Sequence, residues 1–341
     1  MRRFAVLAWL VAFAGAPGVF AAYTAPLHVQ IIALSNSRPN ITVIDAETNR
    51  VIDTANVPDM TTWGWNDDNN YFDGEHLWVG MLNSNNNAAE VALLNLNTRQ
   101  IDRRISIGKE TITVYIGKPS KAGNLLVAKQ GSRQLVVIDI KARTVQRTID
   151  LPMGNGGVAC DVDVGTALDG KERAYVPGLA GNRVVAIDTA TLQVAQTLDF
   201  PEGTRPFMLT VARDGRRLWI QEQAGNSNVI LNGMNLLMVA RTPAGAVPIT
   251  GTFSLDGKLH FTGHRGDPII IANDTETFAE VWRTRVGARP EKLGVHPNGR
   301  FLYAALAGED AVVVLEAATG QLVQRISLGT TPVGLFVRKV M

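Results

Sequence analysis

The sequence predicts an all-β fold, a seven-bladed β-propeller closed by a C-terminal strand that completes the first blade. Three observations support this prediction. A short β-branched phrase recurs seven times, tight-turn signals for hairpins lie between its copies, and the C-terminal segment repeats the start of an inner strand. The mean spacing of the copies is about 45 residues, the period of a propeller blade with four short strands and their turns.

The recurring phrase consists of an apolar β-branched run, a polar residue, a turn with Thr and a second alternating run. Its first copy is residues 41–45 (Ile-Thr-Val-Ile-Asp), followed by Thr48 and Val51. A short continuous apolar run bounded by turn residues is consistent with a strand buried on both faces. The polar position of the seven copies falls at Asp45, Asn95, Asp139, Asp188, Asn232, Asn273 and Glu316.

The segments between the copies read as the two inner strands of each blade. Residues 206–213 and 217–221 flank Asp214-Gly215, and the same layout recurs around Asp256-Gly257 and Asn298-Gly299. Asp-Gly and Asn-Gly pairs adopt the positive φ angles that tight hairpins require. Two β-sandwich domains, the alternative architecture, would not explain one period that runs through the whole chain.

The two ends of the repeat complement each other. The first copy begins near Leu27 without a preceding inner strand. Residues 331–337 (Thr-Pro-Val-Gly-Leu-Phe-Val) match the inner-strand start at residues 205–209 (Arg-Pro-Phe-Met-Leu). We therefore expect the C-terminal strand to join the N-terminal blade, which leaves no open edge between the first and last blades.

Residues 1–21 are predicted to be a secretory signal peptide. Met1-Arg2-Arg3 is basic, residues 4–16 are apolar, and small residues precede a cleavage site after Ala21. The apolar run of about 13 residues is shorter than the roughly 20 that a membrane-spanning helix needs. We expect a periplasmic or secreted protein in which residues 22–341 form a single propeller domain.

The composition excludes several classes of protein. With 46% hydrophobic and 19% charged residues among 341, the chain is not a disordered protein. A single cysteine, Cys160, excludes an internal disulfide framework and a Cys-based zinc site, and we expect it to be buried. The chain has 33 basic and 31 acidic residues, and removal of Arg2 and Arg3 with the signal peptide leaves 31 of each. Nothing in this balance indicates a nucleic acid or an anionic membrane as partner.

The repeat resembles that of the YVTN-repeat family of seven-bladed propellers over nearly all of residues 27–340. The resemblance lies in the Gly/Pro start of the inner strands, the Asp-Gly hairpin, the Gly-Asn loop and the Val-Ile-Asp-x-x-Thr phrase. Residues 175–178 (Tyr-Val-Pro-Gly) stand where the name-giving tetrapeptide would be. The resemblance implies an exported bacterial or archaeal protein. Related propellers carry haem d1 in nitrite reductases or form the heavy subunit of quinone amine dehydrogenases. Their cofactor-binding residues cannot be mapped onto this chain, so the cofactor is unknown.

A binding site is predicted at one mouth of the central channel. In a propeller, the loops between blades and the loops between second and third strands meet there, and ligands favour such concave places. Arg205 and Arg289 each precede a proline at the start of an inner strand and should point toward the axis, where a guanidinium can hold a carboxylate or phosphate with two bonds. The candidate ligand-binding residues are Arg205, Arg289, Arg38, Lys129, His264, Arg265 and Trp63. The alternative is a solvated rim whose arginines pair with neighbouring acids such as Glu291.

No metal site is predicted. Residues 61–74 carry Asp67, Asp68, Asn69 and Asp73, whose oxygens could bind calcium, but their spacing is not that of an EF-hand and a solvated hairpin tip is the simpler interpretation. His264 is the best-placed histidine for a haem or copper ligand. Asp161 and Asp163 share one face of a predicted strand and could line the channel, a weak indication of metal binding or acid–base chemistry.

Two functions from different classes are left open. The first is an exported propeller that binds a small anionic molecule or a partner protein at the channel mouth without catalysis. The second is an enzyme or redox subunit, like the haem d1 or quinone dehydrogenase propellers, that acts on a small substrate. No Ser-His-Asp, P-loop or dinucleotide-binding pattern is found, so the sequence does not decide whether the protein is an enzyme.

Overall fold

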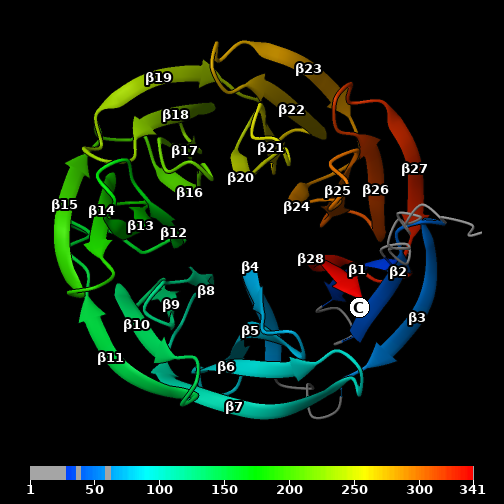
Figure 1. Ribbon diagram of the computed structural model, residues 1–341, viewed down its shortest axis with the longest axis horizontal. Coiled ribbons are helices and arrows are strands. Elements are labelled where there is room, and N and C mark those ends of the chain that lie inside the picture. Colours follow the sequence, from blue (N-terminus) through cyan, green and yellow to red (C-terminus); the bar gives the residue numbers. More distant parts are fainter. Residues whose placement is uncertain (1–27, 36–39, 58–62, 341) are drawn as a thin grey trace, which may run out of the picture.

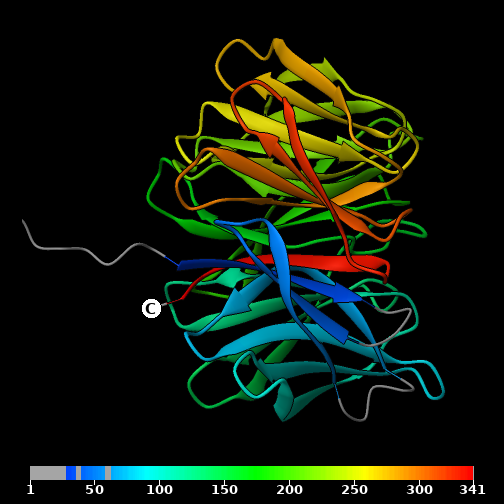
Figure 2. The same cartoon turned by 90° about the vertical axis from the view of Figure 1, so that its right-hand side faces the viewer.

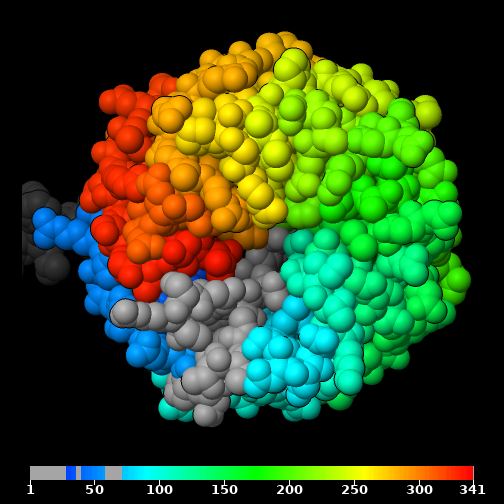
Figure 3. Space-filling model, turned by 180° about the vertical axis from the view of Figure 1, so that it is seen from behind, coloured from blue at the N-terminus to red at the C-terminus, as the bar shows by residue number. Residues whose placement is uncertain are grey.

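The computed structural model describes residues 28–35, 40–57 and 63–340, without the side chains of residues 63–70. These residues form seven antiparallel sheets of four strands each, arranged radially around one axis (Figure 1). Seen from the opposite side, the blades follow one another around the disc in sequence order (Figure 3). The predicted all-β, seven-bladed propeller is therefore confirmed.

We number the blades I to VII and give their strands from the axis outward. Blade I is β28 (Pro332–Val340), β1 (His28–Ser35), β2 (Asn40–Asp45) and β3 (Arg50–Asn56); blade II is β4 (Trp63–Phe72), β5 (His76–Asn83), β6 (Ala88–Asn95) and β7 (Gln100–Lys109); blade III is β8 (Val114–Pro119), β9 (Asn124–Lys129), β10 (Gln134–Asp139) and β11 (Thr144–Asp150).

The remaining blades have the same order. Blade IV is β12 (Asp163–Thr166), β13 (Glu172–Gly178), β14 (Arg183–Asp188) and β15 (Gln193–Asp199); blade V is β16 (Pro206–Val211), β17 (Arg217–Glu222), β18 (Ser227–Asn232) and β19 (Met238–Pro243); blade VI is β20 (Pro248–Phe253), β21 (Leu259–His264), β22 (Ile269–Asp274) and β23 (Glu280–Arg285); blade VII is β24 (Pro290–Val295), β25 (Phe301–Leu306), β26 (Ala311–Glu316) and β27 (Leu322–Ser327).

The ring closes as the sequence predicts. The C-terminal strand β28 pairs antiparallel with β1, with Ile32 opposite Phe336 and Val29 opposite Lys339. The two strands lie side by side in both the axial view and the side view (Figures 1 and 2). Blade I is thus built from both ends of the described chain, and β1 is paired on both sides as the second strand of every other blade is.

The hydrophobic core lies between the blades. The third strand of each blade is buried on both faces, as all six residues of β2 are, whereas the outermost strands are largely exposed, as β11 is. Between blades VII and I, Ile31 and Ile44 pack against Tyr303 and Val314. The continuous Val-Ile runs of the sequence therefore mark strands that are covered by a neighbouring blade on each side.

The polar residue that ends the phrase caps the turn after the third strand in blades I to VI, whereas the Glu316 side chain of blade VII accepts from Arg300. Asp45 Oδ1 accepts hydrogen bonds from the backbone N–H and the hydroxyl of Thr48, at 2.7 Å each. In blade VI the sequence analysis assigned this position to Asn273, and that assignment is wrong by one residue. Asp274 Oδ1 accepts from the N–H groups of Glu276 and Thr277, because β22 extends one residue further than the repeat indicated.

The predicted hairpins are present, with one difference in blade II. Gly215, Gly257 and Gly299 have φ angles of 68°, 75° and 76° at the predicted Asp-Gly and Asn-Gly turns. Residues 63–72 form the inner strand β4 rather than a hairpin tip, and its pairing with β5 is irregular between Asn66 and Tyr71. The hairpin turn itself is Asp73-Gly74.

Residues 1–27, which contain the predicted signal peptide, lie outside the described residues. Within the described ranges, no helix has the length and apolar character needed to cross a membrane.

Candidate functional site: the channel mouth

One face of the ring carries both sets of loops that the sequence analysis expected to form the site. Because the strands of a blade alternate in direction, the loops between blades and the loops between second and third strands lie on the same face. We call this face the mouth and the opposite one, with the first-to-second-strand turns, the hairpin face. Around blades V to VII the mouth loops are residues 200–205, 244–247, 286–289, 223–226, 265–268 and 307–310.

Two of the predicted arginines converge on one carboxylate at the mouth. Arg265 Nε and Nη2 donate to Oε1 and Oε2 of Glu291 at 2.9 and 3.1 Å, and Arg289 Nε donates to Oε1 at 2.7 Å. The Glu291 side chain is 10% exposed, against 44% for Arg265 and 46% for Arg289. We call these three residues the mouth cluster.

The mouth cluster carries one net positive charge. Burial raises the pKa of Glu291, but the hydrogen bonds from the two guanidinium groups outweigh it, and the pKa lies below its usual value. Glu291 is therefore ionised at neutral pH. Within the described residues, Arg289 bonds to Glu291 through Nε alone, so both of its Nη groups can still donate to a ligand.

The carboxylate of the mouth cluster lies on an inner strand. Glu291 belongs to β24, the strand of blade VII nearest the axis (Figure 1), and Arg289 directly precedes this strand. The cluster therefore lies at the inner end of the mouth loops.

Arg205 occupies the same turn position as Arg289. Arg205, Val247 and Arg289 each precede the proline that begins an inner strand, and their φ angles are 55°, 51° and 57°. The Arg205 backbone N–H is fixed by the side-chain oxygen of Asn182 at 2.9 Å. Its side chain is exposed, and no acceptor among the described residues bonds its guanidinium. Arg205 therefore adds a second positive charge to the mouth loops.

Two of the predicted ligand-binding residues, Lys129 and His264, are buried and do not belong to the mouth cluster. Lys129 is 4% exposed, and its Nζ donates to Gln134 Oε1 at 3.3 Å. His264 is fully buried; Nε2 accepts from the Gly245 N–H at 3.0 Å and Nδ1 lies 3.0 Å from the Ile269 carbonyl oxygen. Burial lowers the pKa of His264, which fits a neutral ring bonded to backbone at both nitrogens and leaves none for a metal or haem.

For two further predicted ligand-binding residues, Arg38 and Trp63, the structure describes no side chain. Arg38 lies outside the described residues, and of Trp63 only the backbone, at the start of β4, is described.

The two aspartates of the predicted channel wall hold neighbouring blades together. Asp161 accepts from the Leu209 N–H at 3.1 Å, and burial, with the nearby charge of Asp163, raises its pKa to about 7. Asp163 accepts from the Val211 N–H at 2.9 Å and from Lys118 Nζ at 2.7 Å. These bonds connect blades III, IV and V, which indicates a structural role. Cys160 is buried as expected, and burial raises the pKa of its thiol to about 12.

The sequence analysis treated Glu291 only as a neutralising acid. The signal that could have identified it is the local Arg289-Pro290-Glu291 pattern, in which the proline starts an inner strand and the acid follows on the same strand. Its bond to Arg265, 26 residues earlier, depends on how blades VI and VII pack.

The fold defines the class of protein: a seven-bladed propeller of the kind also found in gluconolactonases. A periplasmic gluconolactonase from Pseudomonas aeruginosa is 15% identical, with a TM-score of 0.71 over 91% of this chain and 99% of its own. A candidate 6-phosphogluconolactonase from Bacteroides fragilis is 14% identical, with a TM-score of 0.72 over 92% and 98%. The hydrazine synthase of Kuenenia stuttgartiensis is 18% identical, with a TM-score of 0.64 over 84% and 95%.

At these identities the likeness concerns the fold alone. No protein-family model matches the sequence, and no curated protein does. The predicted resemblance to the YVTN-repeat family thus stays a prediction, whereas the propeller architecture is common to all of these proteins.

Proposed function

We propose that this protein is an exported propeller that binds a small anionic molecule at the channel mouth, with Arg265 and Arg289 as its main contacts and Arg205 beside them. The observation that carries the proposal is the mouth cluster. Two half-exposed guanidinium groups share one buried carboxylate, so a net positive charge and free donors lie at the mouth. Location in the periplasm follows from the predicted signal peptide, and one protein of the same fold is periplasmic.

The chemistry of the cluster favours a ligand with a carboxylate or phosphate group. Glu291 fixes both guanidinium groups in advance, so binding a ligand loses little side-chain entropy. Charge-assisted hydrogen bonds are worth about 1.5–3 kcal/mol each where the donors are partly removed from water. A sugar acid would also place hydroxyl groups against the polar mouth loops.

Hydrolysis of a sugar lactone at the same place is the second candidate function. The observation in its favour is that two of the proteins with this fold are described as lactonases and align with more than nine-tenths of this chain. In such a reaction water adds to the ring ester, the acyl C–O bond breaks, and a carboxylate and a proton are released. The arginines would stabilise the negative charge that develops on the carbonyl oxygen.

The binding proposal is tested with gluconate, 6-phosphogluconate and inorganic phosphate as probes, and glucose as the neutral control, by calorimetry and thermal shift. We expect at least one anion to bind and Arg289→Gln or Arg265→Gln to weaken it tenfold to a hundredfold, since each lost bond costs about 1.4–3 kcal/mol. The matched control is Arg300→Gln, which removes an arginine paired with Glu316 on the hairpin face. Equal affinity of the wild type and both mouth variants for every anion would refute the proposal.

The lactonase candidate needs a separate measurement. Acid release from gluconolactone and 6-phosphogluconolactone is followed above the spontaneous rate, with the wild type and Arg265→Gln compared. If the wild type releases acid faster than the spontaneous rate and Arg265→Gln does not, the lactonase function is supported. If the wild-type rate equals the spontaneous rate, lactonase activity on these two substrates is excluded.

A further inference from the structure

A second site lies on the hairpin face of blade II, away from the mouth. Three side chains meet there: Glu75 in the turn before β5, His76 at the start of β5 and Asp102 in β7. One ligand atom from each lies within 4.8 Å of the others. Asp73, in the same turn, is also adjacent, with Oδ2 3.4 Å from His76 Nδ1. This site does not depend on the function proposed for the mouth.

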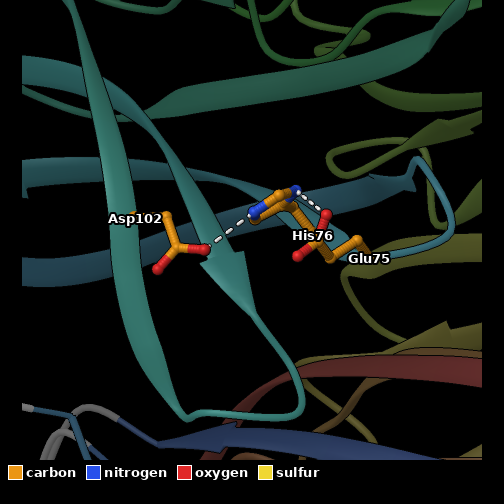
Figure 4. Close-up of side chains that lie close together, drawn as sticks. All are labelled: Glu75, His76 and Asp102. Carbon is orange, nitrogen blue, oxygen red and sulfur yellow. Dashed lines mark hydrogen bonds and ion pairs between the residues drawn. The ribbon is translucent and has the colours of Figure 1, made fainter.

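The imidazole of His76 is held between carboxylates on its two nitrogens. His76 Nε2 lies 2.9 Å from Asp102 Oδ2, and Nδ1 faces Glu75 Oε2 at 3.9 Å (Figure 4). The histidine side chain is 4% exposed, yet its Nδ1 has no hydrogen-bond partner among the described residues. A buried nitrogen without a hydrogen bond needs a partner, and this one faces carboxylate oxygens instead of a donor.

The surroundings suit the tautomer that a metal requires. If Nε2 carries the proton and donates it to Asp102, the lone pair of Nδ1 is free, and carboxylate oxygens of Asp73 and Glu75 lie 3.4 and 3.9 Å from this nitrogen. A carboxylate on the second ring nitrogen is the usual arrangement of a metal-binding histidine. Asn95 Nδ2 donates to Glu75 Oε1 at 3.2 Å and to Asp102 Oδ2 at 3.0 Å, and so holds both acids in place.

The distances around Nδ1 suit a small cation. With metal–ligand bonds of about 2.0–2.1 Å, neighbouring ligand atoms of a tetrahedral site are about 3.3 Å apart. Asp73 Oδ2 is already at 3.4 Å, oriented by the Trp78 indole N–H at 3.0 Å. Glu75 is 62% exposed and can approach from 3.9 Å by a small rotation. The turn that carries both is tight, with Gly74 at φ 104°.

We propose that Asp73, Glu75 and His76 Nδ1 bind a divalent transition-metal ion of the Zn²⁺ type, with Asp102 as the positioning residue behind the histidine. The three carboxylates carry a charge of minus three within a few ångströms, which a dication offsets. Imidazole together with carboxylate selects Zn²⁺, Ni²⁺ or Cu²⁺ over Ca²⁺ and Mg²⁺, which prefer oxygen ligands alone. The ion would tie the β4–β5 turn to the start of β5, and the bond of His76 to Asp102 would connect this site to β7, the outermost strand of the same blade.

The test uses the purified full chain, stripped with EDTA and titrated with Zn²⁺ alone by calorimetry, with the bound metal counted by elemental analysis. We expect a single Zn²⁺ per chain and a rise in melting temperature, with no competition from millimolar Ca²⁺ or Mg²⁺. His76→Gln should abolish binding, and Asp102→Asn should weaken it tenfold to a hundredfold, as outer-shell substitutions do. The matched control is His28→Gln, which removes a half-buried histidine 3.5 Å from Asp45 in blade I and should leave binding unchanged.

Two outcomes would overturn the proposal. One is a wild-type protein that binds no Zn²⁺ at 100 µM; the other is binding that His76→Gln and Glu75→Gln leave intact. Glu75→Gln keeps the test valid even if His76→Gln fails to fold, since Glu75 is exposed and its amide is isosteric.

Discussion

At the scale of single residues, the most unusual feature of the interior is the polar contact between blades V and VI. His260 is fully buried and stacks on Trp219 at 4.4 Å between ring centroids. The corresponding positions in the second strands of blades V and VII are Leu218 and Leu302, both fully buried. Six buried polar atoms of this interface have no hydrogen-bond partner among the described residues, on Trp219, Gln221, Asn228, Thr242 and His260. The propeller repeat thus tolerates a polar ring here, where the two adjacent blades use leucine.

His260 should make stability depend on pH. Burial lowers its pKa from 6.5 to about 3, so the folded state keeps the ring neutral while the unfolded chain binds a proton below pH 6.5. Its contribution is therefore fully present above pH 6.5 and is lost as the pH falls toward 3. Replacement by the leucine of the neighbouring blades, His260→Leu, should make the loss of unfolding free energy between pH 7 and pH 4 smaller by about 3 kcal/mol.

Urea unfolding at the two pH values measures this difference. Met238→Leu, which changes an exposed side chain without a titratable group, is the control and should keep the pH profile of the wild type. Identical pH profiles for His260→Leu and the wild type would show that the buried ring does not resist protonation.

At the scale of elements, one carboxylate connects two mouth loops. Glu110, in the loop between β7 and β8, is 1% exposed. Its Oε1 accepts from the N–H groups of Thr111, Ile112 and Gly131, and its Oε2 from the N–H and hydroxyl of Ser132. Gly131 and Ser132 belong to the loop between β9 and β10. These two mouth loops are thus joined by buried side-chain bonds in addition to the backbone bond from the Gln130 N–H to the Thr113 carbonyl oxygen.

Glu110→Gln should loosen this part of the mouth. The amide places an N–H₂ group against backbone donors on one side, so we expect a loss of about 2–4 kcal/mol in unfolding free energy, since buried donors are left without an acceptor. Burial raises the pKa of Glu110, but the hydrogen bonds outweigh it and the pKa is lowered, so this stabilisation is lost as the pH falls through that lowered pKa. Chemical denaturation at pH 7 measures the loss. The control is Glu202→Gln, in an exposed mouth loop. If both substitutions lower the unfolding free energy by the same small amount, the hydrogen bonds of Glu110 do not stabilise the mouth loops.

At the scale of the whole molecule, stability depends on closure of the ring through β28. This strand supplies the inner position of blade I, and its Leu335 and Val337 pack with the core between blades VII and I. Each blade buries its apolar faces only against its neighbours, so an open ring exposes two faces at once.

Deletion of residues 330–341 should therefore prevent stable folding. The loss of a complete strand exceeds the margin of about 5–15 kcal/mol that a domain has, and the exposed edge of β1 should promote aggregation. Size-exclusion chromatography and thermal melting of the truncated protein test this, with removal of Met341 alone as the control. A truncated protein that stays monomeric and melts like the intact one would show that closure contributes little.

The sequence by itself determined the number, order and type of the elements, because those depend on local signals. The Val-Ile-Asp phrase, the Asp-Gly turns and the inner-strand prolines each act over a few residues, and their repetition was enough to predict seven blades and the closing strand. Only the tertiary structure decided which side chains meet. Arg265 reaches Glu291 from the next blade, His76 meets Asp102 from the far strand of its own sheet, and His264 and Lys129 turn into the interior. Such contacts depend on the alternation of strand faces and on the angle between blades, which pack distant residues together and leave no trace in the spacing of the sequence.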